Sequence, residues 1–453
     1  MESANPEVET ESPEQQPAGS EPPAGPEAPA PEVYSELIAP DRIDPDAVKV
    51  LKRLARHGHD AYLVGGGVRD LLLGHAPKDF DVGTSARPNE VRRLFRNCRI
   101  IGRRFRLAHI LFAGGKIIEV ATFRRDPTQQ GSDAATAVQI EESDDGTRSL
   151  MPAPKERGDD ADLLIRHDNT FGLPHEDAIR RDFTINGLFY DLERDEVIDY
   201  VGGVPDLRAM VVRTIGQPDV RFREDPIRIL RAIKFSARLD LGIAPDVYDA
   251  MVDQREELSR CAPPRVLEEI LRLLRGGAAH RSIYLAWDVG VLGVLLPELT
   301  AHLEDQAADA ELLWDRLRAV DAMRADDRLP GDAVLIAALL YGPLHEAVVG
   351  TRDPSGAFED FFEDMVERLS LPRRMRDRMR LIFAAQRRLD RGKIGPLRKR
   401  EFFPDAVALC EIRCRSEGRE LPAWVADEKD PPDASKRGRD RDRPRRRRRS
   451  RRR

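Results

Sequence analysis

The spacing of apolar residues changes near Asp225, and this change most strongly limits the folds open to the chain. Ahead of it, short apolar runs such as the one in DAYLVGG (60–66) alternate with segments of helical spacing, which is typical of a mixed sheet with helices. From Asp225 to about Cys414, almost every segment has the helical spacing of apolar residues. The sequence therefore predicts an α+β head followed by an all-α region.

The two ends of the chain differ from this middle part in composition. Residues 1–40 contain nine Glu and nine Pro but no Lys or Arg, whereas residues 436–453 contain thirteen basic residues and two Asp. Segments this polar cannot bury enough apolar surface to offset the entropy lost on folding. We therefore expect both termini to be disordered, and the net charge of −6 hides their opposite charges.

Cysteine usage and hydropathy indicate the compartment. Four cysteines in 453 residues do not suggest a disulfide scaffold, and the Cys410–Cys414 spacing lacks the second ligand pair of a zinc site. The N-terminus has no signal-peptide pattern, and no apolar run approaches the roughly 20 residues that cross a bilayer. These features predict a cytoplasmic protein that has no contact with membranes.

One segment, GGGVRDLLLGHAPKDFDVGT (65–84), combines glycines, an arginine and two aspartates. If KDFDVGT forms a strand, Asp79 and Asp81 share a face and Phe80 turns into the core. Two convergent carboxylates suit Mg²⁺, which binds hard oxygen ligands and keeps waters and phosphate oxygens in its other positions. The glycines and Arg69 would then contact the phosphates. The alternative is an exposed strand with two hydrated aspartates.

A second cluster lies in EDAIRRDFTING (176–187). It supplies Arg180, Arg181 and Asp182 directly before an apolar segment. Charged side chains in this position require partners or a functional site, because burying an unpaired charge is costly.

A third cluster, RFREDPIRILRAIKF (221–235), begins a helix with acidic residues and continues with basic ones. Its basic residues recur every three positions, at Arg228, Arg231 and Lys234. One interpretation is an ordinary helix with acidic residues at its positive end and solvated basic side chains. The other is a nucleotide clamp, in which Asp225 and Arg228 contact a base edge and the remaining cations hold a triphosphate.

The three motifs together resemble a known family. In order and spacing, LVGGGVRDLLLG…KDFDVGT, RRDFTINGLFYD and RFREDPIRILRAIKF are similar to the motifs of the class II nucleotidyltransferases. That family contains CCA-adding tRNA nucleotidyltransferases and bacterial poly(A) polymerases. The resemblance implies a nucleotidyltransferase palm, built as a mixed sheet with helices, followed by all-α neck and body domains. It also implies transfer of a nucleoside monophosphate from an NTP to an RNA 3′-hydroxyl.

The resemblance further implies roles for single residues. Asp79 and Asp81 match the metal-binding aspartates, and Asp182 matches the third acidic position of the catalytic site. The positions matched to nucleotide binding are Gly66 and Arg69 at the phosphate turn, Arg180 and Arg181 beside the ribose and phosphates, Asp225 and Arg228 at the base, Glu224 supporting that arginine, and Arg231 and Lys234 near the phosphates. The implied cofactor is Mg²⁺, with Mn²⁺ as the alternative, and ATP is the implied substrate.

The stretch IIGRRFRLAHI (100–110) separates the two branches of this family. CCA-adding members usually carry a small, Gly-containing stretch here. This chain instead resembles the poly(A) polymerase signature through Arg103, Arg104, Phe105, Arg106 and His109. The basic C-terminal tail agrees, because non-specific phosphate binding suits an enzyme that extends many RNA 3′ ends. The alternatives are a CCA-adding enzyme and, more distantly, a non-catalytic RNA-binding protein.

The sequence with its resemblance thus predicts a monomeric poly(A) polymerase that adds AMP from ATP to RNA 3′ ends without a template and releases pyrophosphate. RNA-decay proteins are the further partners considered. The predicted divisions are a disordered acidic tail (1–40), the head (41–215), a helical neck (216–275), a helical body (276–430) and a disordered Arg-rich tail (431–453).

Overall fold

The computed structural model describes residues 30–102, 106–125, 140–142, 148–150, 171–305 and 307–426. The Arg-rich tail and most of the acidic tail lie outside these residues. One part of the acidic tail is described, and there the prediction of disorder is wrong. Residues Glu32–Ser35 form strand β1, which pairs with β10 (Glu196–Asp199) through backbone hydrogen bonds. Arg208 also lies over the Tyr34 ring, 5.2 Å from its centroid. Composition missed this strand because its partner is distant in sequence.

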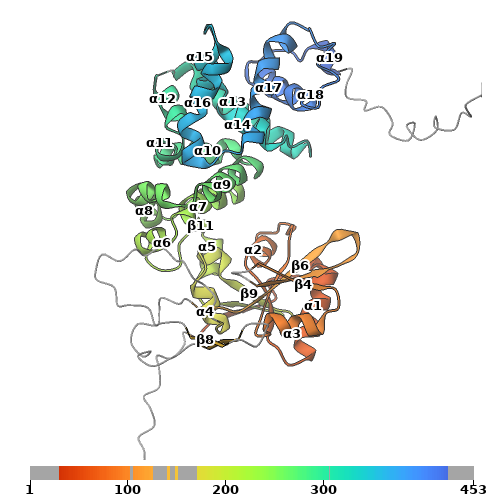
Figure 1. Ribbon diagram of the computed structural model, residues 1–453. Helices are drawn as coiled ribbons and strands as arrows, with labels where there is room; N and C mark the ends of the chain where they lie inside the picture. Colours follow the sequence, from red (N-terminus) through yellow and green to blue (C-terminus); the bar gives the residue numbers. More distant parts are fainter. Residues whose placement is uncertain are drawn as a thin grey trace, which may run out of the picture.

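The head contains a mixed eight-stranded sheet with the order β1-β10-β9-β2-β3-β6-β5-β4 (Figure 1). Its remaining strands are β2 (Ala61–Val64), β3 (Asp81–Thr84), β4 (Cys98–Ile101), β5 (Leu107–Leu111), β6 (Ile117–Thr122) and β9 (Leu188–Asp191). Only β3 and β6 run parallel within it. Two small pairs lie outside it: β7 (Ile140–Glu142) with β8 (Arg148–Leu150), and β11 (Val211–Val212) with β12 (Gly242–Ile243). The predicted mixed sheet is therefore confirmed.

The two faces of the sheet are covered differently. The helices of the head are α1 (Pro45–Arg56), α2 (Gly66–Leu72), α3 (Pro88–Leu94), α4 (Pro174–Ile179) and α5 (Gly203–Arg208). One face buries Leu63, Val82 and Ile110 in the main core, which α1 and α3 complete. On the other face a small apolar cluster around Phe189 includes Ala178 of α4 and covers the β9–β2 side. The β6–β5–β4 side of that face carries Glu119, His109 and Arg99 together with the exposed apolar residues Ile101 and Ile117.

Apart from the two-residue strand β12, the regular structure of the described chain after β11 is helical. The α-helices are α6 (Pro218–Glu224), α7 (Ile227–Leu239), α8 (Pro245–Gln254), α9 (Pro263–Arg275), α10 (Ala279–Asp288), α11 (Val291–Leu295), α12 (Pro297–Asp305), α13 (Ala307–Ala325), α14 (Asp332–Leu339), α15 (Tyr341–Val348), α16 (Pro354–Leu369), α17 (Arg373–Asp390), α18 (Phe403–Ser416) and α19 (Ala423–Ala426). Among the described helices, none combines the length and apolar character that crossing a membrane requires. The predicted all-α region is confirmed.

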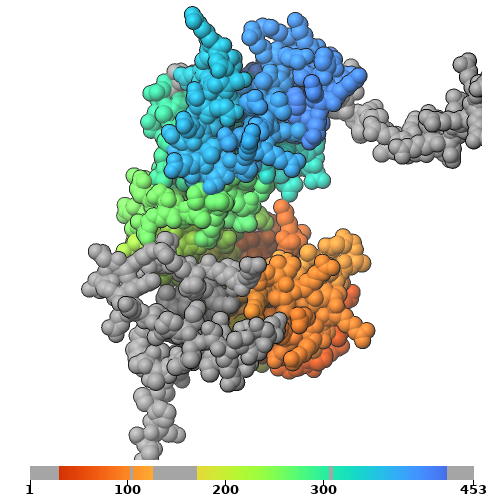
Figure 2. All heavy atoms as spheres, in the orientation of Figure 1, coloured from red at the N-terminus to blue at the C-terminus, as the bar shows by residue number. Residues whose placement is uncertain are grey.

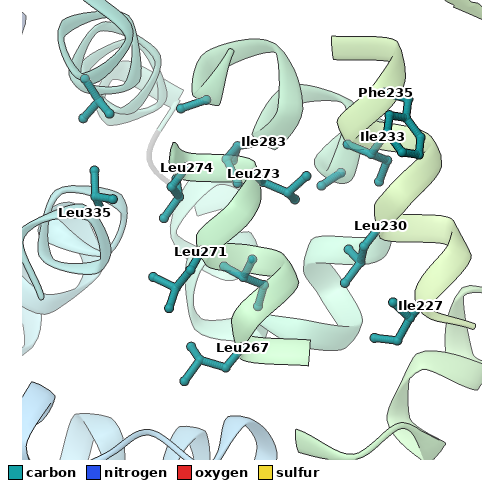
Figure 3. Packing of buried hydrophobic residues seen from close by; sticks show 14 of the residues in the cluster. Ile227, Leu230, Ile233, Phe235, Leu267, Leu271, Leu273, Leu274, Ile283 and Leu335 are labelled. Atoms are coloured by element: carbon teal, nitrogen blue, oxygen red, sulfur yellow. The ribbon is translucent and has the colours of Figure 1, made fainter. Parts of the chain in front are cut away.

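The helices α6–α9 lie between the head and the remaining helices, as the packed atoms in Figure 2 also show. Figure 3 shows their core: Ile227, Leu230 and Ile233 of α7 point toward α9, and Leu273 of α9 points back toward α7. Leu267 and Leu271 lie on the other side of α9, which is turned toward Leu335 of α14. This apolar packing fixes α7, whose other side chains reach the head.

Candidate active site

A glycine turn connects β2 to α2 at the edge of the site. Gly65 has φ +70°, and a Cβ atom there would lie 2.7 Å from Nη1 of Arg181. Gly66 begins α2, and a Cβ atom on it would lie 3.4 Å from the Arg69 guanidinium. The first glycine is therefore required both by its left-handed backbone and by the arginine that lies over the turn.

The two predicted aspartates lie where β3 begins. Asp81 is the first residue of β3 and pairs with Val64 of β2, next to the glycine turn. Asp79 precedes the strand and is exposed, so the prediction that both aspartates belong to one strand is wrong by two residues. Phe80 between them is buried at 9% exposure, as predicted. The chain bends at Lys78, and the exposed Asp79 that follows leaves its carboxylate open to ligands.

The carboxylate of Asp81 is destabilised in its ionised form. Burial, the nearby Glu119 and Asp79 raise its pKa to about 6, while Arg181 opposes this shift. A cation would reverse the effect, so the donor set fits a divalent metal ion. Among the described residues, no group of three His, Cys, Asp or Glu side chains forms a closed metal site. Asp79 and Asp81 are the carboxylates that could hold a divalent metal ion, with its other positions open to water and phosphate.

Glu119 was missed by sequence reasoning. It lies on β6 and is the parallel partner of Asp81, so both point to the same face of the sheet. Its other neighbour is His109 of β5, with 3.4 Å between Nε2 and Oε1. The alternation in IIEVAT predicts that Glu119 faces away from the core but cannot say that its neighbour is Asp81. Of the other signature residues, Arg106 is exposed, and 103–105 lie outside the described residues.

Arg180 and Arg181 are held together by one buried carboxylate. Asp177 accepts hydrogen bonds from Nε of Arg180 at 3.0 Å and from Nη2 of Arg181 at 2.9 Å. Burial alone would raise the pKa of Asp177, but the two arginines lower it. Arg221 of α6 donates to the backbone carbonyls of both arginines, at 2.9 and 2.7 Å. The predicted pair therefore lies in a fixed position beside the glycine turn.

Arg69 and Asp182 belong to a buried network centred on Asn186. Arg69, at 3% exposure, donates to the Asn186 side-chain oxygen at 2.5 Å and to Asp70. The Asn186 amide donates to Asp182 at 2.9 Å, and Arg231 of α7 donates to the same carboxylate at 2.6 Å. Burial would raise the pKa of Asp182, but Arg231, Asn186 and a backbone N–H lower it to about 2. Both residues face this network, and their predicted contacts with phosphate and metal stay predictions.

The predicted base-recognising pair is split between two partners. Asp225 accepts two hydrogen bonds from Arg265 of α9, at 2.9 and 2.7 Å. Arg228 is buried and donates to Glu224 at 3.1 Å, which agrees with the predicted support by that glutamate. Arg265 was missed, because it lies 40 positions from Asp225.

The predicted basic stripe on α7 is paired throughout. Arg228 pairs with Glu224, Arg231 with Asp182, and Lys234 with Glu269 of α9, the last at 3.0 Å. Burial, followed by Arg231, lowers the pKa of Lys234, although Glu269 raises it. The solvated-stripe interpretation is therefore wrong for these three residues.

Three family models match the chain. The model described as "Poly A polymerase head domain" matches residues 61–213, and "Probable RNA and SrmB- binding site of polymerase A" matches residues 240–303. The third, "Polymerase A arginine-rich C-terminus", matches residues 353–453. The first match contains the glycine turn, the aspartates and Asn186.

The individual relatives include poly(A) polymerases and, at lower identity and coverage, CCA-adding enzymes. Poly(A) polymerase I of Salmonella typhimurium is 38% identical over 406 residues, which cover 85% of this chain and 82% of the relative. The CCA-adding enzyme of Geobacillus stearothermophilus is 32% identical over 274 residues, or 60% of each chain. The solved Bacillus stearothermophilus CCA-adding enzyme in complex with CTP has a TM-score of 0.59 at 24% identity, covering 85% of this chain and 82% of that one. This last likeness supports the fold.

Proposed function

Because the chain belongs to the bacterial poly(A) polymerase I family of nucleotidyltransferases, we propose that it adds AMP from ATP to RNA 3′-hydroxyl ends without a template. The observation that carries the proposal is the placement of Asp79 and Asp81 beside the glycine turn on the open face of the sheet. A triphosphate and a metal ion are both expected at such a meeting of carboxylates and flexible backbone.

The proposed reaction is an in-line displacement. The RNA 3′-oxygen forms a bond to the α-phosphorus of ATP, and the bond from that phosphorus to the bridging oxygen breaks. Pyrophosphate leaves with the electron pair, and the hydroxyl proton passes to water. When bound by Asp79 and Asp81, Mg²⁺ or the similarly oxygen-liganded Mn²⁺ supplies charge that activates the attacking oxygen and stabilises the leaving group.

The triphosphate is proposed to lie on the β2 side of Asp81. Arg180 and Arg181 bind it, because Asp177 orients both while leaving each partly exposed. The backbone at Gly66 approaches the phosphates, since a larger residue would crowd the turn. Arg69 acts on this turn from inside the protein, where it is fixed by Asp70 and Asn186.

The neck is proposed to recognise the base. Asp225 offers an acceptor at the start of α7, and Arg228, held by Glu224, offers donors one turn further along. Asp182 positions Arg231 across the junction between the head and α7. Arg231 and Lys234 add positive charge next to the triphosphate.

An assay with single nucleotides tests the proposed function. Purified protein is incubated with a generic RNA, MgCl₂ and each NTP alone, and the products are separated by length. Long ladders are expected with ATP only, and the Asp79→Ala variant is expected to give none. Full ladder formation by that variant would contradict the catalytic role of Asp79. Retention of all cellular function by a variant that forms no ladders would instead favour a non-catalytic RNA-binding protein.

A CCA-adding enzyme is the second candidate, because one relative of that kind is 32% identical over 60% of the chain. It predicts a different product in the same assay. Addition would be confined to a tRNA lacking its CCA end and would require both CTP and ATP.

RNA 3′ ends and ATP are thus the proposed partners, and the cytoplasm is the proposed compartment because both are present there. A monomeric state, contacts with RNA-decay proteins and the domain boundaries stay predictions from the sequence. The Arg-rich tail is proposed to bind RNA phosphates without sequence preference.

A further inference from the structure

Four charged or polar side chains form a row across the open face of the sheet. Asp81 of β3 pairs with Glu119 of β6, Glu119 pairs with His109 of β5, and His109 pairs with Arg99 of β4. Directly paired residues point to the same face, so the row runs from the candidate metal site to the edge of the sheet. At roughly 4.8 Å per strand, Arg99 lies about 14 Å from Asp81.

This row lies in an accessible surface. Glu119 has a side-chain exposure of 47%, and Arg99 is exposed. Next to it on the same face are two apolar residues, Ile101 at 48% exposure and its partner Leu107. The opposite half of the face is covered by α4 and the cluster around Phe189. A ligand of Asp81 therefore has open sheet on the β6–β5–β4 side only, within the described residues.

The charge pattern of the row is unusual for a simple surface ladder. Glu119 pairs with His109, but Arg99 has no ion-pair partner among the described residues. Alternating cross-strand charges would normally neutralise one another. A lone cation at the end of the row is instead suited to an anion that extends away from Asp81.

The geometry of in-line displacement indicates whether the anion at Arg99 is part of ATP or part of the RNA. The attacking oxygen and the leaving pyrophosphate lie on opposite sides of the α-phosphorus. The proposed function places the triphosphate on the β2 side, with the glycine turn and Arg181. The RNA 3′ end must then approach from the opposite side of Asp81, where β6, β5 and β4 follow in order.

We propose that the β6–β5–β4 face binds the 3′-terminal nucleotides of the RNA, with His109 at the terminal nucleotide and Arg99 at the phosphate upstream of it. Glu119 is the positioning residue for His109. Ile101 and Leu107 provide the apolar surface that contacts the sugar and base. This assignment rests on the proposed function. It means that His109, one of the residues that resemble the poly(A) polymerase signature, contacts the 3′-terminal nucleotide of the RNA.

The experiment measures steady-state kinetics of the full chain with a triadenylate primer, which is short enough to occupy little beyond this face. Arg99→Gln and His109→Gln are each expected to lower kcat/KM for the primer about tenfold, with KM for ATP unchanged. Arg99→Lys is expected to recover most of the loss. The salt dependence of log kcat/KM for the primer is expected to lose about 0.7 in slope in Arg99→Gln, as for one lost single-strand phosphate contact.

Arg92→Gln is the matched control, because Arg92 is an exposed arginine on α3, which packs on the other face of the sheet. It removes the same charge and is expected to leave both kinetic constants unchanged. An unchanged primer constant in Arg99→Gln and His109→Gln, or a raised KM for ATP instead, would overturn the assignment. If the unaltered protein extends no primer with ATP, the proposed function itself fails.

Discussion

The head and the neck hold their charged groups in opposite ways. On the sheet face of the head, Asp79 and Glu119 are exposed around Asp81, whose pKa is raised to about 6. In the neck, each basic residue of the α7 stripe has an acidic partner within 3.1 Å or less, and Asp225 is bound by Arg265. The sheet face around Asp81 therefore presents carboxylates that a cation would balance, whereas the charges of the neck and of the network inside the head are already paired.

This difference indicates that the sheet face of the head binds the reacting groups, whereas the neck holds side chains in position. A bound cation stabilises carboxylates that repel one another, and this favours binding of a metal ion at the sheet face of the head. Paired side chains are instead fixed before any ligand arrives, which reduces the ordering cost of binding. We therefore expect the head to change its electrostatics when ligands bind and the neck to keep the same side-chain arrangement.

The largest expected effect comes from removing an unbalanced charge of the head. Asp81→Asn is expected to lower the rate of AMP addition at least about 1,000-fold, because several kcal/mol of metal-derived stabilisation are lost. Its melting temperature is expected to stay equal or to rise, since repulsion from Glu119 and Asp79 is relieved. Single-turnover kinetics and thermal unfolding measure the two quantities.

Glu193→Gln is the control for that variant, because Glu193 is an exposed carboxylate in the turn between β9 and β10. Neither rate nor melting temperature is expected to change. A clear loss of stability in Asp81→Asn would mean that this carboxylate is part of the structural framework of the head and would remove the contrast with the neck.

A paired charge is expected to behave in the opposite manner. Asp182→Asn breaks the buried pair with Arg231 and is expected to lower the free energy of unfolding by about 3 kcal/mol at pH 7. The pKa of Asp182 in the folded protein, about 2, lies below its unfolded value, so this carboxylate stabilises the fold above about pH 4. That contribution is lost as the pH falls toward 2, and the difference between the two proteins shrinks by about 2 kcal/mol.

Urea unfolding at several pH values measures this effect. The matched control is Asp246→Asn, which breaks an exposed pair with Arg213 at 3.5 Å and is expected to change stability by less than about 1 kcal/mol. If the difference between Asp182→Asn and the unaltered protein is the same at pH 7 and pH 3, the pair with Arg231 is not its source.

The glycine turn tests how tightly the head controls its arginines. Gly65→Ala is expected to raise KM for ATP about tenfold, because the new methyl group displaces Arg181. Gly74→Ala is the comparison: its φ of +77° is similar, but a Cβ atom there meets nothing within 4 Å. Gly74→Ala is expected to lose about 1 kcal/mol of stability to its positive φ. Gly65→Ala is expected to lose more, because its φ of +70° is combined with a ψ of −130°, outside the left-handed helical region. Equal values of KM for ATP in the two variants would rule out a role for Arg181 in ATP binding.

Sequence patterns predicted what lies within a single element. The alternation around Phe80 predicted which side chain enters the core, and helical spacing after Asp225 predicted the all-α region. The periodicity of apolar residues is enough to predict the type of a single element and which of its side chains are buried. The resemblance to a family added the assignment of the motifs to one site.

Contacts between distant elements could not be predicted in this way. Arg69 and Asn186 are 117 positions apart, and their hydrogen bond depends on the packing of α2 against the segment that follows α4. Glu119 becomes the neighbour of Asp81 only through the parallel register of β3 and β6. Such pairings are set by sheet order and helix packing, which periodicity in one segment does not specify.

The smallest expected effect comes from breaking one ion pair of the neck, the one between Arg265 and Asp225. Arg265→Gln is expected to free the Asp225 carboxylate, so that this proposed base-recognising residue can rotate and also accept hydrogen bonds from bases other than adenine. Discrimination between ATP and CTP, measured as the ratio of their kcat/KM values, is expected to fall about threefold to tenfold, in keeping with about 1 kcal/mol for an interaction at this level of exposure.

Arg272→Gln is the control, since that arginine pairs with Glu268 and Glu269 on the same helix and leaves Asp225 bound. Unchanged discrimination in Arg265→Gln would show that the neck keeps its shape without this pair. The contrast between the neck and the head would then rest on Glu224, Asp182 and Glu269 alone.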